Sequence, residues 1–175
     1  MSGTNSCGHG LRFIADGMVG RLARWLRLIG NDVEYSKDST DSELIKRAMT
    51  EARTLLTSDV ELYRRAVANG ADAFLVKGKT EAERLAQIAE RFKMSLDVDA
   101  TISRCPTCNS TIRPIKKEQV IDKVPPSTFN VFDEFWECTN SNCGKIYWRG
   151  SHWNKINEHL SKAEKLMKTE QVGHV

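Results

Sequence analysis

Short apolar runs alternate with longer amphipathic stretches along the first hundred residues of the chain. The apolar runs predict strands at residues 11–15, 32–35, 54–57 and 73–76. Apolar residues at helical spacing follow each run and predict helices over residues 18–29, 44–52, 62–67 and 85–92. Because strands and helices alternate through short connections, we predict an α/β fold with a mostly parallel sheet flanked by helices.

The pattern changes near residue 100. Paired cysteines, a double proline at 125–126 and short aromatic segments follow, and the chain closes with an apolar stripe at helical spacing over residues 154–168. We therefore predict three parts, which are a disordered tail at 1–10, an α/β domain at 11–100, and a small cysteine-containing module with a C-terminal helix at 101–175.

Four of the five cysteines form two close pairs. Cys105 and Cys108 have the C-x2-C spacing, and Cys138 and Cys143 have a looser C-x4-C spacing. Such pairs supply the four thiolates of a structural zinc site, which has no open position for a substrate. Two disulfides or free core thiols are the alternative, and a reducing compartment favours the metal. The fifth cysteine, Cys7, is assigned to the tail.

Composition and charge add modest constraints. No apolar run approaches the roughly 18 residues that span a membrane, and residues 1–10 lack the apolar core of a signal peptide, so we expect a cytoplasmic protein without a membrane partner. Residues 11–100 carry 15 basic and 15 acidic side chains, whereas residues 101–175 carry 11 and 8. The net charge of +3 therefore lies in the second half and favours a polyanionic partner without establishing one.

Three aspartates lie where a predicted strand meets a predicted helix. Asp16 and Asp59 follow strands, and Asp41 opens a helix. In a parallel sheet such positions meet at the carboxyl edge, where ligands usually bind. Carboxylates gathered there would suit Mg²⁺ or Mn²⁺, and two such ions about 4 Å apart activate a water and stabilise the leaving oxygen of a phosphodiester.

A structural interpretation of these acids stands beside the catalytic one. Aspartate at a helix start is favoured by capping and by the helix dipole. The pairs Thr40 with Glu43 and Ser58 with Glu61 have the spacing of capping boxes, as does Thr80 with a glutamate at 83. Taken singly, each aspartate is more often structural than catalytic.

Three arginines recur every third residue after the first aspartate. We predict that Arg21, Arg24 and Arg27 lie on the polar face of the first helix, where they could bind phosphates near the acidic edge. An arginine row opposite an apolar stripe is more commonly a solvated helix face.

Three segments in order carry a family resemblance. They are FIADGMVGRLARWLR at residues 13–27, LLTSD at 55–59 and YWRGSHW at 147–153. Together they resemble the Mut-seven C-terminal RNase family over roughly residues 11–167. The resemblance implies a PIN-like nuclease domain with a C-terminal zinc ribbon, and metal-dependent endoribonuclease chemistry.

The resemblance also implies roles for the acids. The first acid of PIN-type sites matches Asp16, the acid opening a central helix matches Asp41, and the acid of a Thr-x-Asp motif matches Asp59. PIN-type sites often have a fourth carboxylate, for which Asp38 and Glu43 are the nearest candidates.

Aromatic residues after the last cysteine are further candidates for contacting RNA. Trp148 and Trp153 offer rings on which unpaired bases could stack, and His152 lies between them. An aromatic on a ribbon strand is nonetheless more often core. For His152, packing with Trp153 behind an N-cap at Ser151 is favoured over RNA contact.

Two functions from different classes remain open, beside a third in which the ribbon is a protein-interaction module without salt-dependent affinity for RNA. The first is an RNA-binding, Mg²⁺- or Mn²⁺-dependent endoribonuclease that hydrolyses phosphodiester bonds. Its domain pairing is similar to that of endonucleases that trim small-subunit ribosomal RNA, which suggests ribosomal RNA as the substrate. The second is a non-catalytic ribosome- or RNA-associated factor that uses the PIN-like fold and zinc ribbon for docking.

Overall fold

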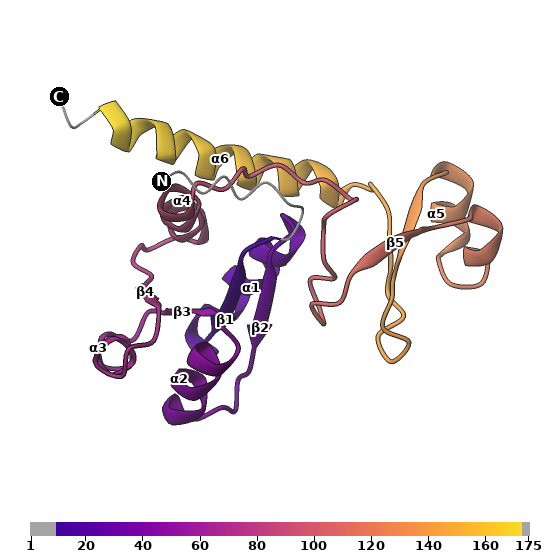
Figure 1. Cartoon of the computed structure of the whole chain (residues 1–175). Coiled ribbons are helices and arrows are strands. Elements are labelled where there is room, and N and C mark those ends of the chain that lie inside the picture. The colour runs from indigo at the N-terminus through magenta and orange to yellow at the C-terminus, as the bar shows by residue number, and fades with distance from the viewer. Residues whose placement is uncertain (1–9, 173–175) are drawn as a thin grey trace, which may run out of the picture.

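The computed structural model describes residues 10–172 and their side chains as far as residue 168 (Figure 1). The predicted tail at residues 1–10 therefore lies outside the described residues except for Gly10. The described chain forms an α/β layer, a small antiparallel sheet beside it, and a long C-terminal helix. This arrangement confirms the predicted fold class.

The first sheet has four short parallel strands in the order β2-β1-β3-β4. Their bounds are Arg12–Ala15 for β1, Asp32–Tyr35 for β2, Thr54–Thr57 for β3 and Ala73–Leu75 for β4. The central strands β1 and β3 pair from Phe13 opposite Thr54 to Ala15 opposite Leu56. Because both faces of these strands are covered, their apolar runs are buried on both sides.

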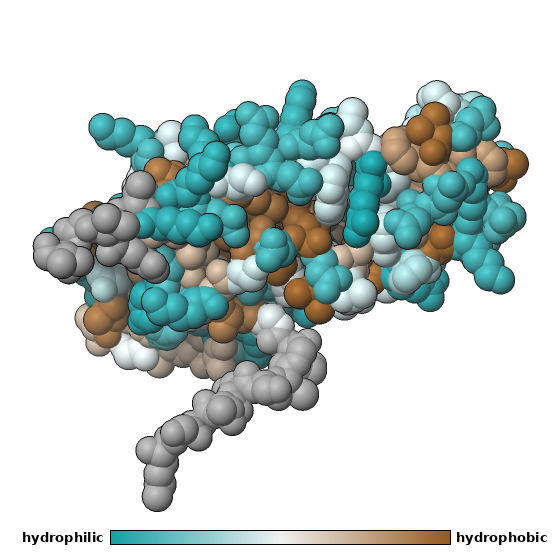
Figure 2. All heavy atoms as spheres, turned by 90° about the horizontal axis from the view of Figure 1, so that it is seen from above, coloured by the Kyte–Doolittle hydropathy of each residue, from teal (hydrophilic) through white to brown (hydrophobic). Residues whose placement is uncertain are grey.

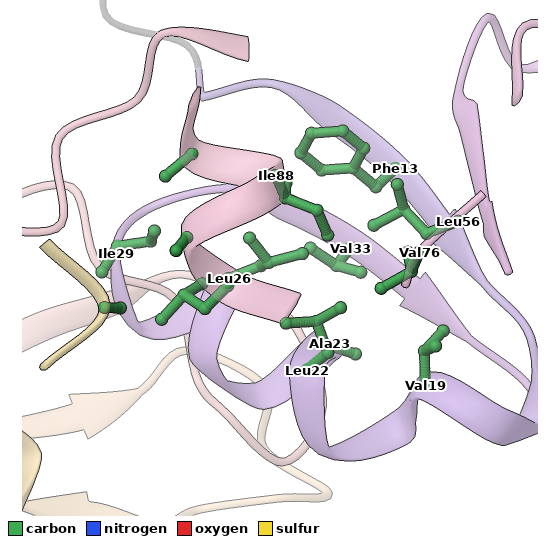
Figure 3. Close-up of a cluster of buried hydrophobic side chains, with 14 of the residues drawn as sticks. Phe13, Val19, Leu22, Ala23, Leu26, Ile29, Val33, Leu56, Val76 and Ile88 are labelled. Atoms are coloured by element: carbon green, nitrogen blue, oxygen red, sulfur yellow. The ribbon is translucent and has the colours of Figure 1, made fainter. Parts of the chain in front are cut away.

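Helices cover both faces of this sheet. Their bounds are Gly20–Leu28 for α1, Asp41–Thr50 for α2, Val60–Ala68 for α3 and Glu81–Phe92 for α4. One core contains Phe13 and Leu56 with side chains of α1 and α4, and Figure 3 shows Leu22 and Leu26 of α1 near Ile88 of α4. The other core contains Ile14 and Leu55 with side chains of α2 and α3.

The long helix α6, His152–Val172, completes the first core. Leu160 and Ala163 are buried in the same cluster as Phe13, and α6 crosses over α4 (Figure 1). Although α6 follows the cysteine module in sequence, its apolar stripe therefore packs on the α/β layer. No helix in residues 10–172 combines the length and apolar character needed to cross a membrane.

The cysteine module contains its own small sheet and core. The antiparallel strands run in the order β5-β6-β7, with bounds Ile112–Ile115, Phe135–Cys138 and Ile146–Tyr147. The connection from β5 to β6 carries a 3-10 turn, Lys117–Val120, and the helix α5, Pro126–Val131. Val120, Val124 and Phe135 form the core. Figure 2 shows hydrophobic surface at this end of the molecule among mostly hydrophilic side chains.

Helix starts follow the predicted capping with one correction. Thr40 and Glu43 form the predicted capping box at α2. At α3 the predicted box with Ser58 is wrong, because the cap is Asp59, whose Oδ1 accepts hydrogen bonds from the backbone N–H groups of Glu61 and Leu62 at 2.7 and 3.1 Å. Ser58 instead donates its hydroxyl to the carbonyl of Val76 at the end of β4. Asp59 directly precedes α3, so it lies one residue nearer than Ser58 to the free N–H groups.

The segment after β1 also differs from the single helix predicted over residues 18–29. It starts as a 3-10 turn, Gly17–Val19, before α1 begins at Gly20. Asp16 caps this turn by accepting the N–H of Met18 at 2.8 Å. The turn therefore holds the carboxylate of Asp16 at the carboxyl end of β1.

Candidate metal centre and nucleic-acid interface

The four paired cysteines converge on one point. Their sulfur atoms all lie within 4.8 Å of one another, with 3.7 Å between Cys105 and Cys143 and 3.3 Å between Cys108 and Cys138. A tetrahedral zinc ion with bonds of about 2.3 Å places its sulfurs about 3.8 Å apart. The quartet therefore fits a closed four-thiolate site, as the spacing predicts.

Backbone turns explain why both spacings work. In the first knuckle, Asn109 has a positive φ of 69°, and its N–H donates to the carbonyl of Cys105 at 2.9 Å. In the second, the N–H groups of Cys143 and Gly144 both donate to the carbonyl of Asn140 at 2.9 Å, and Gly144 has φ 55°. The longer C-x4-C pair is thus closed by a turn that brings Cys143 back beside the end of β6.

The electrostatics of the quartet favour a cation. Burial alone would raise the pKa of the Cys108 thiol, but hydrogen bonds from Ser110 and from neighbouring thiols lower it to about 6. Burial raises the pKa of the Cys138 thiol, which lies against the same sulfurs. Burial and a 2.9 Å contact with the Cys105 sulfur raise the pKa of the Tyr147 phenol, which therefore stays protonated. A bound cation would replace the protons that these thiols share.

Asp16 and Asp59 lie at the carboxyl ends of neighbouring strands and are joined through Thr57. The Thr57 hydroxyl donates to Oδ2 of Asp16 and accepts the N–H of Asp59 at 2.9 Å. Asp16 is 5% exposed, and its N–H donates to the carbonyl of Leu56 on β3 at 3.2 Å. The structure therefore brings two of the three predicted acids to one edge of the sheet.

Asp41 has a different partner. It is the first residue of α2, and its Oδ2 accepts a hydrogen bond at 2.8 Å from Nη1 of Arg65 on α3. Among the described residues, the only group of three or more ligand side chains within 4.8 Å of one another is the cysteine quartet. Asp16 and Asp59 thus share an edge, and the three acids do not form a closed cluster.

The two candidates for a fourth acid lie elsewhere. Glu43 is held by Thr40, which donates to it from the backbone at 2.8 Å and from its hydroxyl at 3.0 Å. Asp38 and Glu43 line a hollow along α2 together with Lys46 and Arg47. This hollow shares no residue with a second hollow that is lined in part by the residues following Asp16.

A polar hollow of about 570 Å³ is lined in part by Gly17 and Met18, the two residues that follow Asp16. Arg21, Arg24 and Arg27 of α1 line it together with one acid, Glu81, and we call it the basic hollow. The side chains of Arg21 and Arg24 are exposed. Its floor depends on a glycine, because a Cβ atom at Gly20 would lie only 2.6 Å from the ring of Tyr35, which also lines the hollow. Two arginines beside the start of a helix form a suitable environment for phosphate groups.

Arg27 lines the same hollow, but the prediction that it lies on the exposed polar face of α1 is wrong. Each step of three residues turns a helix by about 300°, so Arg27 lies about 120° around α1 from Arg21 and points inward. It is 5% exposed, and burial lowers the pKa of its guanidinium. The guanidinium donates to the carbonyl of Val33 at 2.9 and 2.7 Å, and to those of Pro106 and Thr107 at 3.1 and 3.2 Å.

Asn109 is a second link between the two parts, and no local sequence pattern indicates this role. Its side chain accepts the N–H of Val33 at 2.9 Å and donates to Oδ1 of Asp32 at 2.7 Å, both on β2. Ser103 adds a hydrogen bond of 2.6 Å to the carbonyl of Leu28. The first cysteine knuckle is therefore bound tightly to α1 and β2.

The aromatic candidates divide between core and surface. Trp148 is half-buried and packs against Phe135 in the module's core, with ring centroids 6.5 Å apart, so the core interpretation holds for one face of its ring. His152 is exposed at the first residue of α6, contrary to the packing expected for it. Trp153 is half-buried, and the guanidinium of Arg149 lies 5.2 Å from its ring centre.

The parallel sheet and the cysteine quartet beside the small antiparallel sheet define the class of protein. It is an α/β protein with an attached module that resembles a zinc ribbon. A family model described as the Mut7-C RNAse domain matches residues 11–160, and the chain belongs to this family. Comparison with curated proteins and with solved structures found no match. Family membership confirms the resemblance seen in three sequence segments and indicates a nuclease or RNA-related role.

The metal centre makes a direct prediction for the protein's zinc content. Purified protein is expected to hold one zinc ion per chain, and Cys138→Ser to lose it, because the site needs all four thiolates. Cys7→Ser is the matched control, since Cys7 is the one cysteine outside the quartet, and it should retain full zinc. Elemental analysis checks both variants. Equal zinc in Cys138→Ser and in wild type would contradict the assignment.

The arginines make a second prediction, which separates structural from ligand-binding roles. Arg27→Ala should lower the free energy of unfolding by about 3 kcal/mol or more, because the buried carbonyl of Val33 and the part-buried carbonyls of Pro106 and Thr107 lose their donor. Arg24→Ala, the same change at an exposed position of α1, should leave stability within about 0.5 kcal/mol and weaken RNA binding. Urea unfolding and RNA titration measure the two effects, and equal destabilisation by both variants would contradict this division.

Proposed function

We propose that the protein is a metal-dependent endoribonuclease that hydrolyses phosphodiester bonds in RNA. The arrangement of Asp16, Thr57 and Asp59 beside the arginine-lined hollow is the observation that carries this proposal. It combines carboxylates, which suit a hard cation, with arginines, which suit phosphates, at the edge of a parallel sheet where ligands usually bind. Membership of an RNase family supports the same reaction class.

The donor set suits Mg²⁺ or Mn²⁺ held by Asp16, Asp59 and Asp41. Oδ1 of Asp59 caps α3, and its Oδ2 has no hydrogen-bond partner among the described residues. Asp41 must leave Arg65 to join them. The side chains of Asp41 and Arg65 are 47% and 45% exposed, and ion pairs this exposed contribute only about 0–1 kcal/mol to stability. A cation could therefore displace Arg65.

The roles of the chain's own residues follow from this arrangement. Thr57 fixes the orientation of the Asp16 carboxylate, and the 3-10 turn after β1 holds its other oxygen. Arg21 and Arg24 bind the RNA phosphates that neighbour the scissile bond. When bound, a divalent cation would lower the pKa of a water and offset charge on the phosphodiester.

We further propose RNA of the ribosome as a substrate and the cytoplasm as the location. The first rests on the similarity of this domain pairing to that of endonucleases that trim small-subunit ribosomal RNA. The second rests on the four-thiolate site, which persists in a reducing compartment.

The ion pair between Asp41 and Arg65 favours a second candidate function. If that pair persists, only two acids remain at the edge, which is fewer than a cation site of this type uses. The protein would then be a non-catalytic factor that docks on RNA or on the ribosome through the basic hollow and the zinc ribbon.

Asp16→Asn separates the two functions. We expect wild type to cut ribosomal RNA fragments with Mn²⁺. The cleavage rate of the variant should fall by more than the roughly 100-fold seen when a residue that supports a metal ligand is changed, because Asp16 is itself a proposed ligand. Its affinity for RNA should stay within about twofold of wild type. Asp122→Asn, the same change at an exposed residue of the cysteine module, is the control and should cut normally. Binding without any cleavage by wild type would support the docking factor instead.

A further inference from the structure

A second, apolar hollow lies on the other side of the first cysteine knuckle. It has a volume of about 90 Å³, and three tryptophans, Trp136, Trp148 and Trp153, contribute to its walls. At about 30 Å³ for each water in the liquid, this space corresponds to roughly three waters, which is the scale of one small ring. The hollow therefore suits a single flat group rather than a whole ligand.

Arg104 and Arg149 both line this hollow, and Arg149 lies over two of the rings. The guanidinium of Arg149 lies 5.5 Å from the centre of the Trp136 ring and 5.2 Å from that of Trp153. Both distances are within the range of cation–π attraction. Arg149 is itself exposed, so it borders the hollow from the solvent side.

The walls are held by three different parts of the fold. Trp136 lies on β6, and Trp148 is supported from behind by Phe135 in the core of the cysteine module. Trp153 lies in the first turn of α6, whose later turns are buried on α4. Leu28 of α1 lines the side formed by the α/β layer. Because these supports are packed, the rings are largely in place before a ligand binds.

The position of the knuckle connects the apolar hollow with the basic one. Pro106 lines the apolar hollow, and the next residue, Thr107, lines the basic hollow with Arg21 and Arg24. Consecutive Cα atoms are about 3.8 Å apart, so the two hollows approach each other across a single knuckle. An aromatic slot beside an arginine-lined groove is the combination that binds single-stranded nucleic acid, with the base in the first and the phosphates in the second.

We propose that the apolar hollow holds one unstacked nucleobase of an RNA strand whose backbone crosses the knuckle to the basic hollow. The inference rests on the proposed RNA function and narrows its substrate to RNA with an unpaired nucleotide near the bound phosphates. A base held against these tryptophan rings would fix the register of the strand relative to Asp16. An apolar side chain from a protein partner would lack the phosphates that the neighbouring arginines suit.

Two labelled oligomers of equal length and charge test the slot in the full zinc-bound chain. One is oligouridine, and the other is the same ribose-phosphate strand without bases. Wild type is expected to bind oligouridine about tenfold more tightly, because stacking of one base contributes roughly that factor. Trp153→Ala and Arg149→Ala should each bring the ratio of the two affinities close to one. Arg64→Ala removes the same charge at an exposed site on α3 and should keep the wild-type ratio.

The ratio makes the test independent of overall stability and charge. If Trp153→Ala fails to fold, the wild-type ratio and Arg149→Ala still decide the matter. A wild-type ratio near one, or a ratio that both slot variants retain, would overturn the proposal. Cleavage of ribosomal RNA fragments with Mn²⁺ would be unaffected by that result, whereas failure of the nuclease function would remove cleavage and leave the base-dependent ratio.

Discussion

The buried guanidinium of Arg27 is the interaction on which the architecture depends. It binds the carbonyl of Val33 on one side and those of Pro106 and Thr107 on the other, so it joins the α/β layer to the metal knuckle. A buried charge without these acceptors would be costly, so both partners must be in place together. The same two knuckle residues contribute to the two hollows, and a metal ion bound by the cysteine quartet would therefore stabilise both.

This dependence separates the roles of the two halves. The cysteine module has only a small core, and its metal site and its contacts with α1 and β2 supply the remaining stability. The α/β layer carries the acids and the exposed arginines. Because α6 leaves the module and packs on α4, the chain crosses from one half to the other twice, and neither half has its full set of contacts alone.

Local patterns predicted most of the fold. The strand Thr54–Thr57 and the capping box at Thr40 were predictable because alternation of apolar runs and cap spacing are local properties. The metal quartet was predictable for the same reason, since each pair is close in sequence. The inward position of Arg27 and the link through Asn109 were not predictable. The carbonyls that Arg27 contacts on the knuckle lie about eighty residues further along the chain, and residue spacing within a helix carries no information about them. Asp16 and Asp59 lie at the strand ends where the sequence pattern places them, but the pairing of Asp41 with Arg65 is a tertiary contact without a local signal.

The central claim is that Asp16 and Asp59 bind a divalent cation beside the basic hollow. A crystal structure of the zinc-bound protein soaked with Mn²⁺, with anomalous scattering recorded at the manganese edge, tests it most directly. The account predicts a manganese peak between the carboxylates of Asp16 and Asp59, with Asp41 turned away from Arg65 toward it. A structure in which manganese is absent from this edge, and in which each aspartate keeps only its capping or ion-pair contacts, would contradict the claim.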